Sequence, residues 1–175
     1  MPVLLRTLHF RYGNQSMKKN LLCFLMITPL FVSFAQAQSN SEKAVHDIQA
    51  LKKAALYYIE SQHETNAKKM EFALHPKIAK RTYWKKTDGN EHIIENNYQS
   101  MLQVAQNYNK SGTKFAKHPK KIVEILDHDK RVATVKLIAD EWIDYMHLIK
   151  QDNGQWKVIN VLWQYHDISR HDKSK

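Results

Sequence analysis

The chain has 175 residues, a formal net charge of +10 and a single cysteine, Cys23. This length allows one domain with a substantial hydrophobic core. One cysteine excludes an internal disulfide and any cysteine-rich metal site, and the positive charge alone does not identify a partner.

Residues 18–37 have the three parts of a secretory signal peptide. A basic pair precedes an apolar run, and a small-x-small cleavage motif ends at Ala37. The apolar run is short for a helix that spans a bilayer. We therefore expect residues 1–37 to be a leader, with export to the periplasm or the medium and no stable membrane span after cleavage. Met17 is then a candidate for the true start of translation.

Three amphipathic helices are expected at the start of the mature chain, which we place in one domain over residues 38–168. The first begins at the capping-box pair Ser39 and Glu42 and continues at helical spacing to about residue 60. The second covers residues 66–74, and the third covers residues 98–108. The polar tail, residues 169–175, is expected to be disordered.

Strand-forming residues dominate the second half of the chain. A short hairpin, or a strand followed by a loop, is expected over residues 77–94, with the turn at Asp88-Gly89. Residues 122–165 then predict a meander of four antiparallel strands, whose last turn is signalled by Asn153-Gly154.

The last strand predicts apolar side chains on both faces of the sheet. Such a sheet needs helices over one face and a second subunit over the other, so we expect a homodimer formed through the sheet. Simple alternation puts one set of residues on each side: Trp156, Val158 and Leu162 against Ile159, Val161, Trp163 and Tyr165.

The order of elements and several short motifs resemble the nuclear transport factor 2-like, or SnoaL-like, superfamily. Within it, the chain is most similar to the putative lumazine-binding family. The resemblance implies an α+β fold: a cone in which a curved antiparallel sheet wraps around about three N-terminal helices. The matching segments are Ala44-Val45, Tyr58-Ile59, Phe72–Pro76, Asp144–Lys150 and Gly154–Asn160.

Members of this superfamily include isomerases and dehydratases, which implies acid–base chemistry in the hollow of the cone. Asp144 and His75 are the candidate catalytic residues. A carboxylate inside an apolar strand is costly unless it is paired, but Asp144 could also be an outward residue paired with a lysine. His75 could equally serve the backbone of its turn. The chain has Thr65-Asn66 and Lys77 where relatives tend to have acids, which favours binding over catalysis.

A ligand pocket in such a hollow is mostly apolar, with a few convergent polar groups. A two-residue turn at Asn153-Gly154 would pair odd with even residues and direct the face of His147 and Asn160 into the hollow, sending Asp144 to the other face. The expected ligand-binding residues are Tyr57, Tyr58, Tyr145, His147, Trp156 and Asn160.

The sequence therefore predicts an exported binding or accessory protein for a small apolar or aromatic molecule. The alternative is an acid–base enzyme of the isomerase or dehydratase type that uses the same pocket. The spacing of the histidines and acids predicts no metal site, and no cofactor motif is present. Two basic segments, residues 77–86 and 110–121, are expected to be solvated surface, and we expect no nucleic acid partner.

Overall fold

The computed structural model describes residues 18–174, with side chains described for residue 38 and from residue 41 onward. The expected start at Met17 lies outside the described residues. Contacts divide the chain into two units, Met1–Ala44 and Val45–Lys175, and the folded domain is the second.

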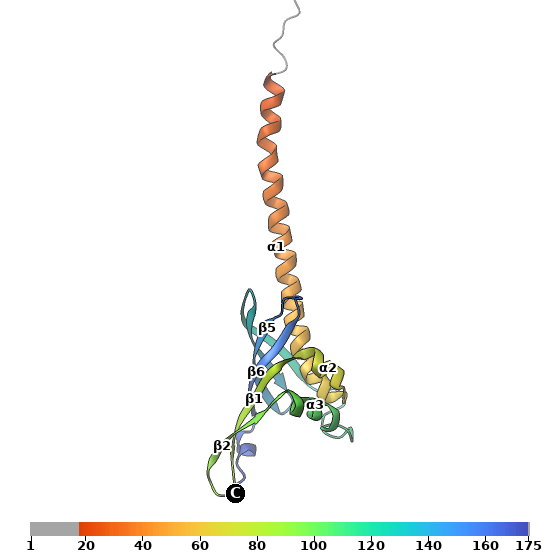
Figure 1. The fold of residues 1–175 in the computed structure, drawn as a ribbon, viewed down its shortest axis with the longest axis vertical. Helices are drawn as coiled ribbons and strands as arrows, with labels where there is room; N and C mark the ends of the chain where they lie inside the picture. The colour runs from red at the N-terminus through yellow and green to blue at the C-terminus, as the bar shows by residue number, and fades with distance from the viewer. Residues whose placement is uncertain (1–17, 175) are drawn as a thin grey trace, which may run out of the picture. The chain divides into compact units, whose positions relative to one another are not determined.

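The described chain folds into helices and a six-stranded sheet (Figure 1). The helices are α1 (Lys18–His63), α2 (Ala67–Ala73), α3 (Tyr98–Asn107) and the 3-10 helix η1 (Ile168–His171). The strands are β1 (Leu74–Lys85), β2 (Glu91–Asn96), β3 (Lys121–Asp129), β4 (Val132–Ala139), β5 (Trp142–Lys150) and β6 (Trp156–Tyr165).

Side-chain caps fix the starts of the two short helices. Asn66 accepts a hydrogen bond from the backbone N–H of Lys69 at 3.1 Å, and Asn97 accepts one from Ser100 at 3.0 Å. The second and third expected helices are therefore confirmed. The expected start of the first helix at Ser39 is wrong for the full chain, because α1 begins at Lys18 and continues through that position.

The sheet has the strand order β2-β1-β6-β5-β4-β3. The expected β1–β2 hairpin and the meander from β3 to β6 are both confirmed. The sheet is mixed rather than wholly antiparallel, because β1 pairs with β6 in parallel and brings Lys80 beside Val161. Strands from the two halves of the chain thus pair within one sheet.

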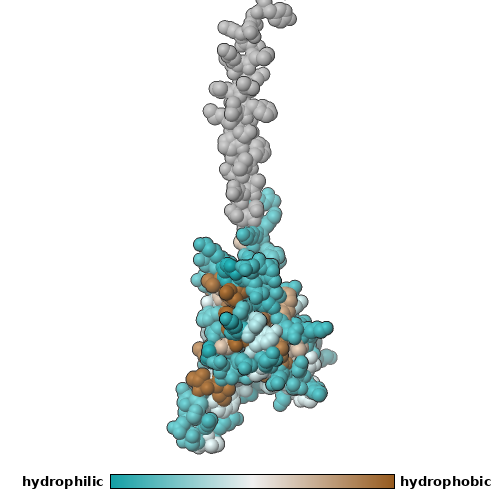
Figure 2. Space-filling view, viewed as in Figure 1, coloured by the Kyte–Doolittle hydropathy of each residue, from teal (hydrophilic) through white to brown (hydrophobic). Residues whose placement is uncertain are grey.

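The helices cover one face of this curved sheet, which gives the α+β cone expected from the sequence (Figure 1). Leu51, Tyr58 and Ile59 of α1 pack into one core with Leu137 and Met146 of the sheet. The visible surface of the domain is mostly hydrophilic, with separate hydrophobic spots (Figure 2). In the described part of the chain, no helix combines the length and apolarity needed to cross a membrane.

A bulge in β6 decides which side chains enter the core. Leu148 pairs with Val158, but the preceding residue of β5, His147, pairs with Asn160, so Ile159 is an extra residue. The simple alternation expected for this strand is therefore wrong. The side chains that face the core come from β6 residues before and after the bulge. They are Trp156, Val158, Val161, Trp163 and Tyr165.

The turn before β6 is also longer than expected. The backbone N–H of Gln151 donates to the carbonyl of Gln155 at 2.8 Å, leaving three residues in the loop, and Gly154 adopts φ +82°. The third loop residue shifts the pairing of β5 with β6 by one position, and the bulge at Ile159 shifts it back. His147 consequently still faces Asn160 across the strands, as a two-residue turn would place it.

The C-terminal segment packs against the domain, so its expected disorder is wrong for the described residues. His171 is 1% exposed, and its Nε2 accepts the backbone N–H of Tyr165 at 2.9 Å. Its ring contacts four aromatic side chains, and the next residue, Asp172, forms a bridge to β1. The four are Tyr83, Trp84, Trp163 and Tyr165.

We predict that His171 makes the stability of the domain fall at acidic pH. Burial lowers the pKa of this imidazole, although a hydrogen bond at Tyr83 opposes the shift. The folded state then binds fewer protons than the unfolded state, so the free energy of unfolding falls as the pH drops below about 6.5. Urea unfolding at about pH 7.5 and pH 5.5 measures this loss.

His171→Leu is the matched variant, since it keeps an apolar side chain in the aromatic cage but cannot titrate. It should show a smaller loss between the two pH values. His63, whose pKa burial also lowers, should contribute to the loss that remains. An unchanged pH dependence in His171→Leu would contradict the assignment.

Candidate functional site

The interior of the cone contains a buried carboxylate on β5. Asp144 is 0% exposed and accepts hydrogen bonds from three side chains on three elements. Lys80 Nζ lies 3.1 Å and Tyr58 Oη 3.4 Å from its Oδ1, and Trp142 Nε1 lies 2.9 Å from its Oδ2. Both carboxylate oxygens are thereby satisfied within the protein.

Lys80 reaches the same cluster from β1. Ile78 and Thr82 flank it at a spacing of two residues and are both buried, so strand alternation directs Lys80 inward. Its ammonium group also donates to Tyr58 Oη at 2.5 Å and lies 4.9 Å from the centre of the Trp163 ring. An amine at only 7% residue exposure therefore has hydrogen-bond partners and an aromatic neighbour.

The cluster is arranged as a directed chain of donors. Lys80 donates to Tyr58, and Tyr58 donates to Asp144. Burial, and then the charge of Asp144, raise the pKa of Tyr58 well above its usual range, so the phenol remains protonated. Because isolated buried charges are costly, the ion pair of Lys80 and Asp144 depends on its complete set of hydrogen bonds.

A cavity of about 150 Å³ opens beside this cluster. Lys80 and Trp142 belong to both the cluster and the cavity wall. The buried indole N–H of Trp163 has no hydrogen-bond partner in the described part of the chain. The wall combines four aromatic rings with one cation and two amides, and its residues are Gln62, Lys80, Asn96, Met101, Val104, Tyr108, Trp142, Trp163 and Tyr165.

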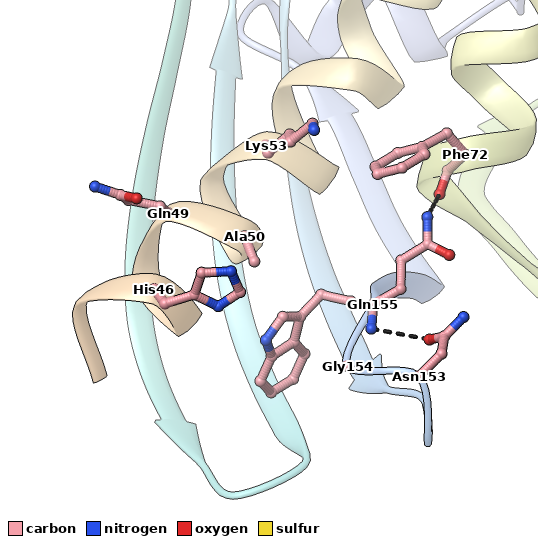
Figure 3. Close-up of a pocket in the computed structure, with 9 residues that line it drawn as sticks. His46, Gln49, Ala50, Lys53, Phe72, Asn153, Gly154 and Gln155 are labelled. Carbon is pink, nitrogen blue, oxygen red and sulfur yellow. Dashed lines mark hydrogen bonds between the residues drawn. The ribbon is translucent and has the colours of Figure 1, made fainter. Parts of the chain in front are cut away.

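A second cavity, of about 520 Å³, lies at the start of β6 (Figure 3). One wall is the face of α1 that carries His46 and Lys53, and the other is formed by Phe72 and Gln155. Gln155 Nε2 donates to the carbonyl of Phe72 at 3.3 Å, which ties the β5–β6 turn to α2. The buried Lys80–Asp144 pair does not belong to this wall, so the smaller cavity is the better candidate for specific chemistry.

The structure corrects the expected orientation of β5. Asp144 faces the interior, whereas Tyr145 is 46% exposed and His147 is also exposed, so the face of Tyr145 and His147 does not line the hollow. Asn160 lies with them, accepting from Arg81 Nη1 at 3.1 Å and lying 3.2 Å from His147 Nδ1. The expected choice of face is wrong, because the bulge at Ile159 inverts the alternation of β6.

The other expected site residues are dispersed. Tyr58 is in the buried cluster, but its neighbour Tyr57 packs on Phe72 with ring centres 5.1 Å apart. Trp156 lines the second cavity. His75 serves its turn, since its Nδ1 accepts the backbone N–H of Lys77 at 3.1 Å. Their roles as ligand-binding or catalytic residues stay predictions.

Sequence reasoning missed Lys80, Trp142 and Trp163 as members of one site. Lys80 lies in a segment with several other basic residues, which suggested a solvated surface. The buried alternation with Ile78 and Thr82 was the available signal. Among the described residues, no group of three or more histidine, cysteine or acidic side chains is arranged to hold a metal ion.

Comparison with known proteins identifies a family for this chain and solved structures with a similar fold. The model of a family described as putative lumazine-binding matches residues 46–164. A search of curated proteins gave no match. A solved NTF-2 like protein of unknown function from Silicibacter pomeroyi DSS-3 is similar in fold, with a TM-score of 0.57 at 11% identity, over 70% of this chain and 98% of that chain.

A second solved structure is more distant. It is a putative scytalone dehydratase from Novosphingobium aromaticivorans DSM 12444, with a TM-score of 0.47 at 10% identity, over 71% of this chain and 87% of that chain. At these identities the likeness to solved structures concerns the fold alone.

We predict strong energetic coupling between Lys80 and Asp144. Lys80→Met or Asp144→Leu alone leaves an uncompensated buried charge and should lower the free energy of unfolding by about 3–5 kcal/mol. The double variant removes both charges and should recover most of that loss. Urea unfolding of the four proteins measures the coupling, and additive losses would show that the two charges do not depend on each other.

Proposed function

Because this chain belongs to the putative lumazine-binding family of the nuclear transport factor 2-like superfamily, we propose that it binds a small planar aromatic molecule in the 150 Å³ cavity. The observation that carries the proposal is Lys80, held by Asp144 at the wall of a cavity lined by four aromatic rings. The rings favour a flat apolar ligand. The ammonium group favours a ligand with a hydrogen-bond acceptor.

The acceptor is a carbonyl or carboxylate oxygen. Lys80 is the cation of the cavity wall, and Asp144 behind it fixes the position of the amine. Charge-assisted hydrogen bonds are stronger than neutral ones, so such a contact would orient the ligand. The ring of Trp163 lies in the same wall and adds an aromatic contact for the ligand.

The size of the cavity limits how much of the ligand is enclosed. A volume of this order accommodates about one aromatic ring. A larger ligand extends through the mouth, near the exposed Tyr108. Lumazine, which the family description names, is a planar molecule with carbonyl oxygens and therefore has the proposed chemistry, with one part of its ring system outside the enclosed space.

Acid–base catalysis is the second candidate, and it is favoured by the position of Asp144 inside the cone beside Tyr58. Binding is the better supported of the two. Both oxygens of Asp144 already accept protein hydrogen bonds, and Lys80 and Trp142 stand between Asp144 and the cavity. A general base must reach the proton it removes, which this enclosed carboxylate does not do.

We also propose that the protein functions outside the cytoplasm. Support comes from the sequence of residues 18–37, which has the order of a signal peptide. Loss of the first 37 residues removes four basic and no acidic residues, so the mature chain keeps a formal net charge of +6. The domain that contains the cavity begins at Val45, after the expected cleavage site at Ala37.

We predict that benzoate binds more tightly than benzylamine, because only benzoate carries an acceptor for Lys80. Quenching of tryptophan fluorescence reports binding, since Trp142 and Trp163 line the cavity. The double variant Lys80→Met/Asp144→Leu should weaken benzoate binding about tenfold or more, as expected for loss of a hydrogen bond to a charged group.

Lys53→Met is the matched control, because Lys53 lies in the second cavity. It should leave benzoate affinity unchanged. If Lys53→Met weakens binding and the double variant does not, the ligand occupies the second cavity and the proposed site is wrong.

We also propose that the domain forms a homodimer through the outer face of its sheet. Tyr145 and Leu162 are paired there, 46% and 57% exposed, and Ile122 on β3 is also exposed. Large exposed apolar side chains on one face of a sheet are typical of interaction surfaces. The helices cover the opposite face, so the outer face is the one available for a second copy.

We predict that Tyr145→Lys combined with Leu162→Lys shifts the mass measured by light scattering from two chains to one. Ile168→Lys is the control, since Ile168 is exposed but lies on η1. A wild-type mass of one chain at micromolar concentration would contradict the dimer.

A further inference from the structure

The Lys80 amine lies between a carboxylate and a phenol, and these groups could assist a reaction of the amine with a ligand. A lysine attacks a carbonyl carbon only through its neutral amine, so it needs a nearby group that takes its proton. The reaction also needs an acid that protonates the carbonyl oxygen. Both groups must lie within hydrogen-bond distance of the amine, and water must be kept away from the product.

Lys80 has both partners. Asp144 Oδ1 is 3.1 Å from Nζ and can take the proton. Tyr58 Oη is 2.5 Å from Nζ, and burial followed by the charge of Asp144 keeps it protonated by raising its pKa. An oxygen on a carbon bonded to Nζ would lie near this hydroxyl. The acceptor and the donor come from different elements, β5 and α1, and converge on one amine.

The position of Lys80 also suits a covalent contact. Its residue exposure is 7%, yet it belongs to the wall of the 150 Å³ aromatic cavity. A ligand in this cavity therefore meets Lys80, whose side chain is otherwise largely shielded from bulk water. Lysines on the surface, such as Lys77 on the same strand, lack this arrangement.

We infer that Lys80 forms a reversible covalent imine with an aromatic aldehyde bound in this cavity. The inference rests on the proposed function, because it uses the same cavity, and it narrows the ligand's acceptor to a reactive carbonyl group. The cavity thereby acts as a covalent trap for aldehydes that carry an aromatic ring.

The chemical step balances without an oxidant or a reductant. Lys80 transfers a proton to Asp144, and the neutral amine bonds to the carbonyl carbon as the carbonyl electron pair moves to oxygen. That oxygen takes a proton from Tyr58, and the nitrogen returns one to Tyr58, which gives a carbinolamine. Tyr58 then protonates the hydroxyl group and takes up the proton held by Asp144, whose Oδ1 lies 3.4 Å from Tyr58 Oη. Water leaves, and the nitrogen lone pair forms the carbon–nitrogen double bond.

The product keeps the charge balance of the buried pair. The protonated imine carries one positive charge, as the ammonium group did, and Asp144 is again a carboxylate. The step therefore does not leave an uncompensated charge in the interior. Addition of water reverses the reaction and releases the aldehyde.

Reductive trapping tests the inference on the folded protein. Benzaldehyde is added at low concentration with cyanoborohydride, which reduces the imine to a stable benzylamine, and peptide mapping by mass spectrometry measures labelling at each lysine. Labelling at Lys80 should exceed labelling at Lys77 about tenfold or more, since acid–base assistance contributes at least that much. Equal or weaker labelling at Lys80 would overturn the inference.

Two comparisons assign the effect to this site. Tyr58→Phe should reduce labelling at Lys80 and leave Lys77 unchanged, because the phenyl ring keeps the packing but removes the proton donor. Benzoate should protect Lys80 and not Lys77. A Tyr58→Phe variant that is labelled at Lys80 like the wild type would overturn the assigned role of Tyr58.

The outcomes separate this inference from the proposed function. If benzoate binds at the cavity but Lys80 is not preferentially labelled, the covalent step is wrong and the binding function stands. If benzoate does not bind and Lys80 is nevertheless labelled in preference to Lys77, the covalent step stands and the proposed benzoate-type ligand is wrong.

Discussion

The buried pair of Lys80 and Asp144 constrains the rest of the domain. The two residues belong to β1 and β5, which are separated by β6, so the lysine side chain must cross β6 to reach the carboxylate. Lys80 lies beside Val161, and Asp144 lies beside Trp163. The pair therefore exists only if β6 presents these two side chains to the interior and if β1 joins β6 in parallel.

The bulge at Ile159 meets this requirement. Without the extra residue, alternation from Val158 would turn Leu162 inward and move Val161 and Trp163 to the outer face. The cavity would then lose the aromatic ring that lies 4.9 Å from Lys80. The extra residue thus directs Val161 and Trp163 into the interior that surrounds the ion pair. It leaves Leu162 on the outer face beside Tyr145.

Much of the fold follows from local sequence signals, whereas the site depends on the bulge. Asn66 caps a helix and Gly154 occupies a positive-φ turn position, and both are recognisable from residue type. A run of apolar residues around Ile159 gives no sign of where an extra residue falls, so the face assignment failed. Lys80 was hidden among basic neighbours, and the order of the C-terminal segment depends on a cage of rings distant in sequence from His171.

The same cage connects the end of the chain to the cavity. His171 contacts Trp163 and Tyr165, which also line the cavity. Its imidazole fixes the backbone at Tyr165 through a hydrogen bond of 2.9 Å, and Arg170 lies 3.8 Å over the Tyr165 ring. The positions of two cavity-lining rings are therefore set in part by the last residues of the chain, so the C-terminal segment belongs to the support of the site.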